Sequence, residues 1–579
     1  MPRSLCTVCL AAAVALLTAA WAPGPASGFA GLVDAYLDAF ARRHPSIAAG
    51  NGLHAHDGLL EDFSAAAIEA EAADLDAWRL KLGAIDAAAL TPDERVDHRI
   101  LAGVIDGWLL DLRQVRTWQR NPAIYVSAVS DGVHDLMVME SAPAGQRARQ
   151  IVSKLERLPA LLAAARANIL NPPPLFVTRG ASAARGTAAM LRRDLPLAFE
   201  SLADAPLRNG LALAGRKAAD LLDAYADDLE KDLLPRAKGT FVIGRSNLEA
   251  RYRAEELIDL PADRLLAIGE RELARTQAAF RAAAARVAPG REPLAVWESV
   301  LADHPAPGQL VAAARKAVDD LLAFGEAKRL LAMPPHDPVV VAPALPFDLG
   351  LASMHSSPPL EEKPVRSFYY LTDAAPDWPP ARQDAWLRKF NYATLSDVSA
   401  HEVYPGHFAH SVFMRRTPGK IRRIWIGLNP FPQPSSGQDG WAHYAEQLVI
   451  DEGFHADDRR YELAQLSEAL TRICRLIAGI RVHTDGWTLD QAASYFEQEA
   501  HLPAPAARQE AERASYDPTY GGYFLGKLAL LKLRRDVERR DGAAFDLREF
   551  HRRVLTQGIA PWWAHRQLML PGDRGAVIE

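Results

Sequence analysis

Hydrophobic residues recur every three or four positions through most of the first half of the chain, which is the spacing of one helix face. A representative series is Leu222, Tyr225, Leu229 and Leu233. Alanine, leucine, arginine and glutamate dominate residues 29–331, and these residues favour helices by intrinsic propensity. The pattern predicts a mostly α-helical protein whose first half serves chiefly as a scaffold.

A second hydrophobic series predicts where a helix is interrupted. It consists of Ile151, Leu155, Leu158 and Leu162. Pro159 falls inside the series, and proline removes a backbone hydrogen bond, so we expect the helix to kink or restart there. The chain has no repeat of fixed period, so a solenoid is not expected.

The pattern changes near residue 333. Prolines crowd between residues 334 and 364, and three valines follow one another at 339–341. Residues 365–371 then give the strongest strand signal of the chain. We expect a small β element near the active site, whose strand at 365–371 could align an extended peptide by main-chain pairing.

Helical spacing resumes near residue 383 and continues through the last third of the chain. The expected core positions there are Phe545, Phe550, Val554 and Leu555. Helices on both sides of a short β element again predict a mostly α-helical architecture.

Composition and charge narrow the class of partner. The chain has 579 residues, of which 49% are hydrophobic and 24% charged, as in an ordinary globular protein. Its formal charge is only -6, and no long block of lysine or arginine occurs. Because nucleic-acid recognition depends on concentrated positive charge, we do not expect a nucleic-acid partner.

The first residues have the pattern of a secretory signal. Arg3 supplies a positive start, residues 10–21 form a short apolar run, and small residues follow at 26–28. We therefore predict a signal peptide over residues 1–28, with an uncleaved N-terminal anchor as the alternative. No second apolar segment is long enough to span a bilayer, so we expect an exported protein, periplasmic or secreted, without stable membrane insertion.

Cysteine usage and the change of pattern suggest the organisation of the mature chain. Cys6 and Cys9 lie in the predicted signal, so Cys474 remains alone and cannot form an intramolecular disulfide. We predict a helical scaffold over residues 29–335 and a catalytic region over residues 336–579.

The strongest chemical signal is segment 401–407, His-Glu-Val-Tyr-Pro-Gly-His. A zinc peptidase needs two neutral imidazoles, a further ligand, an open position for water and a general base. The common helical solution places the two histidines four residues apart, whereas His401 and His407 are six apart. Six residues turn an ideal helix by about 600°, so the two rings would lie roughly 120° apart.

Two residues inside the segment suggest how the rings meet. Pro405 cannot donate the hydrogen bond of a continuing helix, and Gly406 accepts unusual backbone angles. A helical bulge at these residues would bring His407 back toward His401. The alternative is that Pro405 ends the helix and the two histidines do not meet.

Two further motifs follow this segment in order. Residues 440–448 read Gly-Trp-Ala-His-Tyr-Ala-Glu-Gln-Leu, and residues 518–528 read Pro-Thr-Tyr-Gly-Gly-Tyr-Phe-Leu-Gly-Lys-Leu. Together the three motifs resemble the bacterial DUF885 family, and a looser similarity covers most of the mature chain. The sequence departs from the family pattern at Phe408 and at His443. The resemblance implies a zincin-like metallopeptidase related to the gluzincins.

The resemblance also implies a metal site. His401, His407 and Glu446 would bind one Zn²⁺ per chain, and Glu402 would act as the general base. The alternative for Glu446 is a salt bridge to a basic residue. Zinc is inferred from two imidazoles and a carboxylate, a ligand set in which manganese or cobalt could substitute.

Residues of the third motif complete the expected site. Tyr523 would stabilise the oxyanion of the reaction, with a core tyrosine as the alternative. Tyr520 and Lys527 are the candidates for substrate binding, and a solvated helix lysine is the alternative for Lys527.

These features predict an enzyme, a zinc-dependent peptidase that cleaves a peptide substrate by a metal-activated water, with Glu402 as the base. One alternative is a non-catalytic exported protein that binds metal or peptide. Another is a zinc hydrolase that acts on a non-peptide amide or ester. The presence of Glu402 favours an enzyme, while endo- or exopeptidase action and the oligomeric state stay open.

Overall fold

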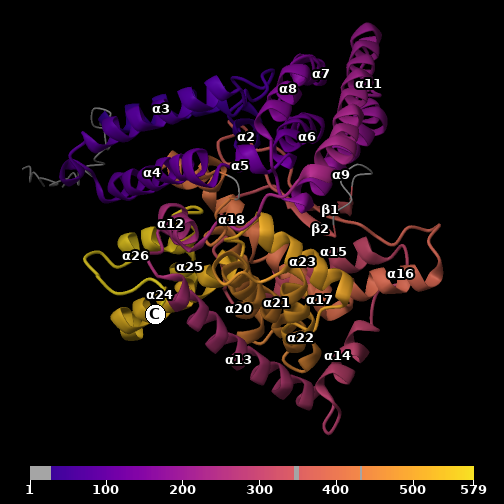
Figure 1. The fold of residues 1–579 in the computed structure, drawn as a ribbon. Helices are drawn as coiled ribbons and strands as arrows, with labels where there is room; N and C mark the ends of the chain where they lie inside the picture. Colours follow the sequence, from indigo (N-terminus) through magenta and orange to yellow (C-terminus); the bar gives the residue numbers. More distant parts are fainter. Residues whose placement is uncertain (1–27, 345–350, 431–432) are drawn as a thin grey trace, which may run out of the picture.

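The computed structural model describes residues 28–344, 351–430 and 433–579 (Figure 1). The predicted signal peptide lies outside the described residues except for Gly28, which begins the first helix. Helices occupy 69% of the chain and the described sheet has three strands, so the predicted mostly α-helical fold is confirmed. Within the described residues, no helix is both long and apolar enough to cross a membrane.

The first half of the chain is a succession of helices that ends before the sheet. In order these are α1 (Gly28–Arg43), α2 (Pro45–Gly50), α3 (Ala65–Gly83), α4 (Pro92–Leu110), α5 (Thr117–Arg120), α6 (Ala123–Val138), α7 (Ala144–Leu155), α8 (Leu158–Asn168), α9 (Pro174–Ala189), α10 (Leu195–Ala198), α11 (Ala205–Asp228), α12 (Arg245–Glu255), α13 (Ala262–Val287), α14 (Pro293–Leu301) and α15 (Leu310–Ala327).

Both hydrophobic series lie where their spacing predicts. Leu222 and Tyr225 are buried on α11, and Leu229 and Leu233 are buried on the π-helical turn that continues it. The other series is divided as expected, because α7 ends and α8 begins with Pro159 in its first turn. Proline is tolerated there because the first N–H groups of a helix have no intrahelical partner.

The sheet follows α15 and has the order β1-β3-β2. Its strands are β1 (Val340–Pro343), β2 (Ala352–His355) and β3 (Phe368–Leu371). β1 is parallel to β3 and β2 is antiparallel to it. The predicted strand at 365–371 is therefore present as β3.

The expected role of that strand needs correction. β3 is the central strand, so its backbone groups are already paired on both sides and it cannot align a peptide. The edge strand β2 was not predicted. It has only four residues, and all four are half-buried, so its sequence shows no clear alternation of hydrophobic and polar positions. β2 contacts α17 (Tyr392–Glu402), the helix that carries the chemical segment.

The remaining helices follow the sheet. In order these are α16 (Pro380–Leu387), α17 (Tyr392–Glu402), α18 (His407–Met414), α19 (Lys420–Ile424), α20 (Gln438–Asp451), α21 (Arg459–Thr484), α22 (Leu489–Glu499), α23 (Ala504–Tyr516), α24 (Gly522–Asp541), α25 (Leu547–Leu555) and α26 (Trp562–Met569). Phe550, Val554 and Leu555 are buried as predicted, and Phe545 packs against the same core.

Buried side chains form three clusters. The largest joins α12–α15 to the sheet and to most helices after it, so this core spans residue 335, the boundary predicted from composition. A second cluster lies within α6–α11, and a third joins α1–α4 to α19 and α26. Figure 1 shows α3 and α4 side by side above the body that contains α12–α26.

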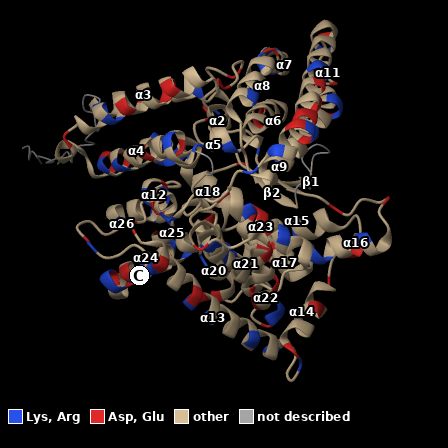
Figure 2. Ribbon diagram, viewed as in Figure 1, with Lys and Arg blue, Asp and Glu red and all other residues tan. Residues whose placement is uncertain are grey.

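Charged residues of both signs alternate along the outer helices, for example on α3, α4 and α11 (Figure 2). Many of the buried charges are paired with a charge of opposite sign, for example Arg251 with Asp111 and Arg566 with Asp536.

A buried ion pair joins the first and last parts of the chain. Arg422 of α19 is fully buried, and its Nε donates to Asp97 of α4 at 2.8 Å. Its other nitrogens donate to Asp93 and to Gln557. Burial raises the pKa of Asp97 to about 6, although the charge of Arg422 opposes this shift. The pair fixes α4 against α19.

Replacing Asp97 with alanine is expected to destabilise the protein by about 3 kcal/mol, because Arg422 would keep its buried charge with a weaker set of partners. Denaturant unfolding measures this change. Lys316→Ala is the matched control: it removes the exposed pair with Asp320 and should cost less than about 1 kcal/mol. Equal effects of the two substitutions would contradict a structural role for the buried pair.

Candidate metal centre

The chemical segment is divided between two helices. α17 ends at Glu402, residues 403–406 form an irregular connection, and α18 begins at His407. The peptide bond between Tyr404 and Pro405 is cis. The helix thus ends before Pro405, as the alternative interpretation of the sequence expected. The two histidine rings nevertheless lie next to each other.

Gly406 makes this connection possible. A Cβ atom at this position would overlap the carbonyl oxygens of His401 and Ala400. Only glycine lets the backbone pass so close to the end of α17. The connection is held from the other side by Trp441 of α20, whose Nε1 donates to the carbonyl of Pro405 at 2.9 Å.

The rings of His401 and His407 lie with their centroids 4.6 Å apart and their planes at 83°. The Nε2 atoms of both rings face Asp439, at 3.7 Å and 3.6 Å from its Oδ1. One ligand atom from each of the three residues lies within 4.8 Å of the other two. Ligands at tetrahedral angles about 2.0–2.2 Å from zinc are about 3.3–3.6 Å apart, so the cluster suits one ion.

The cluster remains accessible from solvent. The side chains of His401, His407 and Asp439 keep 12%, 11% and 26% of their exposure. An ion, and a water molecule beside it, can therefore reach these side chains without unfolding of a helix.

Glu446, the ligand implied by the resemblance, lies outside this cluster. Its Oε1 accepts hydrogen bonds from His401 Nδ1 at 2.7 Å and from Arg472 at 2.8 Å. Its Oε2 accepts from His443 Nδ1 at 2.9 Å. Both carboxylate oxygens are thus engaged, on the side of the His401 ring opposite to Asp439.

Electrostatics agree with an ionised Glu446. Burial raises its pKa, but the charge of Arg472 and the two histidine contacts hold the pKa well below its ordinary value. Burial lowers the pKa of His401, while its interactions with Asp439 and Glu446 raise it, to about 10. The His401 ring therefore lies between two carboxylates, one facing each ring nitrogen.

Asp439 is the site residue that sequence reasoning missed. It stands directly before the Gly-Trp motif and seven residues before Glu446, which is about two helical turns. The two carboxylates therefore share one face of α20. This spacing was the available signal, since either residue could have completed a site with the histidines.

A close helix contact places the third motif beside the cluster. A Cβ on Gly440 of α20 would lie only 2.7 Å from the Cα of Gly526 on α24. These two glycines let the helices approach and bring Tyr523 near Asp439, whose charge, together with burial, raises the tyrosine pKa. The Tyr523 hydroxyl oxygen accepts a hydrogen bond from Arg513 at 2.6 Å.

Glu402, the predicted base, is the last residue of α17 and is half-buried. Burial is the main cause of the raised pKa of Tyr369 on β3, and the charge of Glu402 adds to it; the same charge adds to the effect of Asp439 and Glu446 on the pKa of the adjacent His401. The residue predicted as base thus lies next to the cluster in the chain and acts on it electrostatically.

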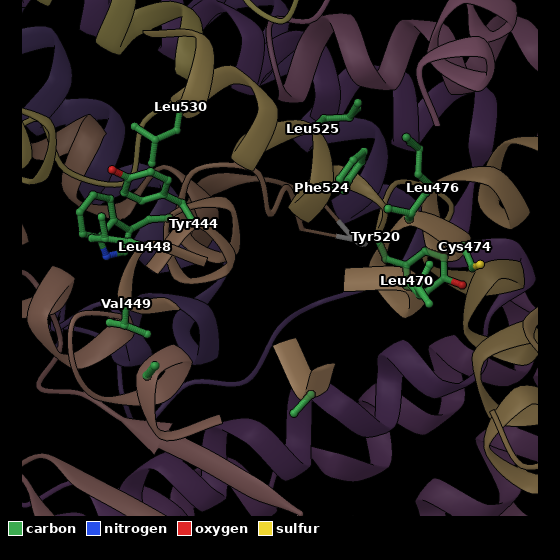
Figure 3. Close-up of a cluster of buried hydrophobic side chains, with 14 of the residues drawn as sticks. Tyr444, Leu448, Val449, Leu470, Cys474, Leu476, Tyr520, Phe524, Leu525 and Leu530 are labelled. Atoms are coloured by element: carbon green, nitrogen blue, oxygen red, sulfur yellow. The ribbon is translucent and has the colours of Figure 1, made fainter. Parts of the chain in front are cut away.

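The two predicted substrate-binding residues are enclosed. Tyr520 lies among core side chains such as Leu470 and Cys474 (Figure 3), and its hydroxyl donates to the backbone of Glu510. Lys527 is also buried, and desolvation lowers its pKa to about 8. Neither side chain offers a surface that a substrate could contact.

Comparison with known proteins identifies the family. The DUF885 family, described as "Bacterial protein of unknown function", matches residues 45–568. The chain belongs to the DUF885 family. No curated protein sequence matches this DUF885 member.

Solved structures share its fold. One from Shewanella oneidensis, described as "a putative lipoprotein of unknown function", is 23% identical, with a TM-score of 0.78 over 94% of this chain and 100% of that chain. Another, described as "the putative lipoprotein from Colwellia psychrerythraea", is 18% identical, with a TM-score of 0.76 over 93% of this chain and 98% of that chain. At these identities the likeness of the DUF885 protein to them concerns the fold alone.

Replacing Gly406 with alanine is expected to destabilise the DUF885 protein by about 1–3 kcal/mol, because the new methyl group collides with the end of α17. Denaturant unfolding measures the change. Gly186→Ala on α9 is the control, since a Cβ there meets no atom within 4 Å and alanine favours a helix. An unchanged stability of the Gly406 variant would refute the tight passage.

Proposed function

We propose that this DUF885 protein is an exported zinc-dependent peptidase whose metal is held by His401, His407 and Asp439. One observation carries the proposal: two imidazole nitrogens and one carboxylate oxygen converge within 4.8 Å. Catalytic zinc sites have three protein ligands of this kind and keep a fourth position for water. Bound zinc would polarise a carbonyl and lower the pKa of its water to about 7.

Glu446 takes an orienting role in this proposal instead of the ligand role implied by the resemblance. By accepting the Nδ1 proton of His401, it would leave Nε2 as the ring nitrogen that gives up its proton when a metal binds. Carboxylates that hold a metal-bound histidine in this way fix its tautomer and raise its basicity. Arg472 and His443 also donate hydrogen bonds to the Glu446 carboxylate and so hold it in place.

Glu402 is proposed as the general base. It would take a proton from the attacking water and pass it to the leaving amine, a two-way transfer that one carboxylate can perform. Its position at the end of α17, beside His401, supports this role.

Tyr523 is proposed to donate a hydrogen bond to the oxyanion. Arg513 donates to the phenolic oxygen, so the tyrosine keeps its own proton for another acceptor. A donor held in advance at the point where negative charge develops stabilises the transition state. Substrate contacts by Tyr520 and Lys527 have no part in this mechanism, because both side chains are enclosed.

A peptide is the proposed substrate, and β2 is the strand that would align it. β2 lies at an edge of the described sheet and contacts α17, so a peptide paired with it would lie beside the helix that carries Glu402. Edge strands commonly bind extended peptides by main-chain hydrogen bonds.

Export is proposed from two observations. Residues 1–28 have the composition of a signal peptide. Two solved structures with this fold are described as putative lipoproteins.

Asp439→Ala is expected to reduce zinc from about one ion per chain to nearly none, because a ligand is lost. Glu446→Gln also removes the ion pair with Arg472, but in the folded variant the ion should stay bound with an affinity about 10–100-fold weaker, because the three ligands remain and the support of His401 is weakened. Elemental analysis and zinc titration measure both, and Asp451→Asn at the end of α20 is the control. Zinc retained in the Asp439 variant and lost in the Glu446 variant would make Glu446 the ligand.

Glu402→Gln is expected to lower peptide cleavage by about 10²–10⁴-fold while zinc stays bound, because the proton acceptor is lost and the ligands are intact. A panel of peptides, esters and non-peptide amides measures turnover, with Glu497→Gln on α22 as the control. Full turnover in the Glu402 variant would exclude this base. A zinc-loaded native protein that cleaves esters alone, or nothing, would favour the other hydrolase or a binding protein.

A further inference from the structure

A cavity lies along α18 and is not lined by His401, His407 or Asp439. It is a cavity of about 620 Å³, within the size range of small-molecule sites. Phe408, Ser411, Val412 and Arg415 line it from one helix face, at steps of three and four residues. None of the three proposed metal ligands belongs to its lining.

Two arginines give this cavity positive charge. Arg415 donates from Nη1 to the carbonyl of Pro358 and from Nη2 to that of Glu361, both at 2.6 Å. Arg416 donates from Nη2 to the carbonyl of Pro335 at 3.2 Å. These bonds satisfy guanidinium donors, but neutral carbonyl groups do not cancel a full charge.

Neither arginine forms an ion pair with a carboxylate of the described residues. In the part of the chain that the structure describes, no carboxylate oxygen lies within 4.0 Å of either guanidinium, although Asp337 also lines the cavity. The Glu361 carboxylate is bound to His54 instead. Burial lowers the pKa of Arg415; the charge of Glu361 opposes this shift and the charge of Arg416 adds to it.

Two buried hydroxyl groups add hydrogen-bond donors. Ser357 and Ser367 line the cavity and keep only 6% and 9% of their exposure. The Ser367 oxygen accepts from the Ser357 backbone, and the Ser357 oxygen accepts from the Val365 backbone. Among the described residues neither hydroxyl proton has an acceptor, so both can be donated to a ligand.

The remaining walls are apolar. They are formed by Pro335, Pro364, Val365, Phe408 and Val412. Two guanidinium groups without an ion-pair partner and two spare hydroxyl donors favour a ligand that is anionic and accepts hydrogen bonds, while the apolar walls favour a carbon body.

We propose that this cavity binds a small organic anion, with its carboxylate or phosphate group at Arg415 and Arg416 and its apolar part against Phe408 and Val412. The site is separate from the proposed metal centre and does not depend on peptidase activity. It shares α18 with His407, so an occupant would also brace the helix that carries this residue.

Calorimetric titration of the full chain tests the proposal with three probes: benzoate, uncharged benzyl alcohol and inorganic phosphate. Benzoate and phosphate should bind at low salt, and benzyl alcohol should not. Tighter binding of benzoate would indicate a carboxylate with an apolar body, and tighter binding of phosphate would indicate a phosphate ester. Binding should persist after a chelator removes metal, which separates this site from the metal centre.

Arg416→Gln is the informative variant, because this arginine is exposed and its removal should leave the fold intact. It should weaken benzoate at least tenfold. Arg291→Gln, which removes another exposed arginine with a carbonyl partner, should leave the affinity unchanged. Equal binding of benzyl alcohol, no binding of either anion at millimolar concentration, or full affinity in both Arg416→Gln and Arg415→Gln would overturn the proposal.

Discussion

The centre of the helical body is organised around one buried carboxylate. Glu446 has no exposed surface, and a charge removed from water is costly unless it is paired and hydrogen-bonded. Its partners His401, His443 and Arg472 lie on α17, α20 and α21. Compensation of this charge therefore holds three helices in one arrangement, and the direction of the His401 ring follows from it.

α17 ends at Glu402, one residue after His401, so the second histidine must come from another helix and meet the His401 ring where it points. The connection over residues 403–406 turns the chain so that α18 presents His407 to His401, and Gly406 gives the clearance for this turn. The contact of Gly440 with Gly526 then keeps α24 and its tyrosine beside α20. Backbone approach, more than side-chain packing, assembles the candidate centre.

α18 and the residues directly after it contribute to two sites of different charge, the candidate metal centre and the cavity lined by Arg415 and Arg416. At its first residue, His407 faces the carboxylate of Asp439 and takes part in a balanced cluster. Two turns later, Arg415 and Arg416 have carbonyl partners and leave positive charge at a cavity. Paired charges hold the geometry of the first site, whereas two arginines without an ion-pair partner can attract an anionic ligand to the second.

The sequence by itself determined the helices, the strand at 365–371 and the chemical segment 401–407, because periodicity and the backbone chemistry of proline and glycine act locally. It did not determine β2, whose pairing with β3 depends on contacts distant in the chain. Nor could it choose between Asp439 and Glu446, which share one face of α20 two turns apart. The packing of α17 against α20 places the His401 ring between them, with Nε2 toward Asp439 and Nδ1 toward Glu446, and no local pattern encodes this relation between two helices far apart in the chain.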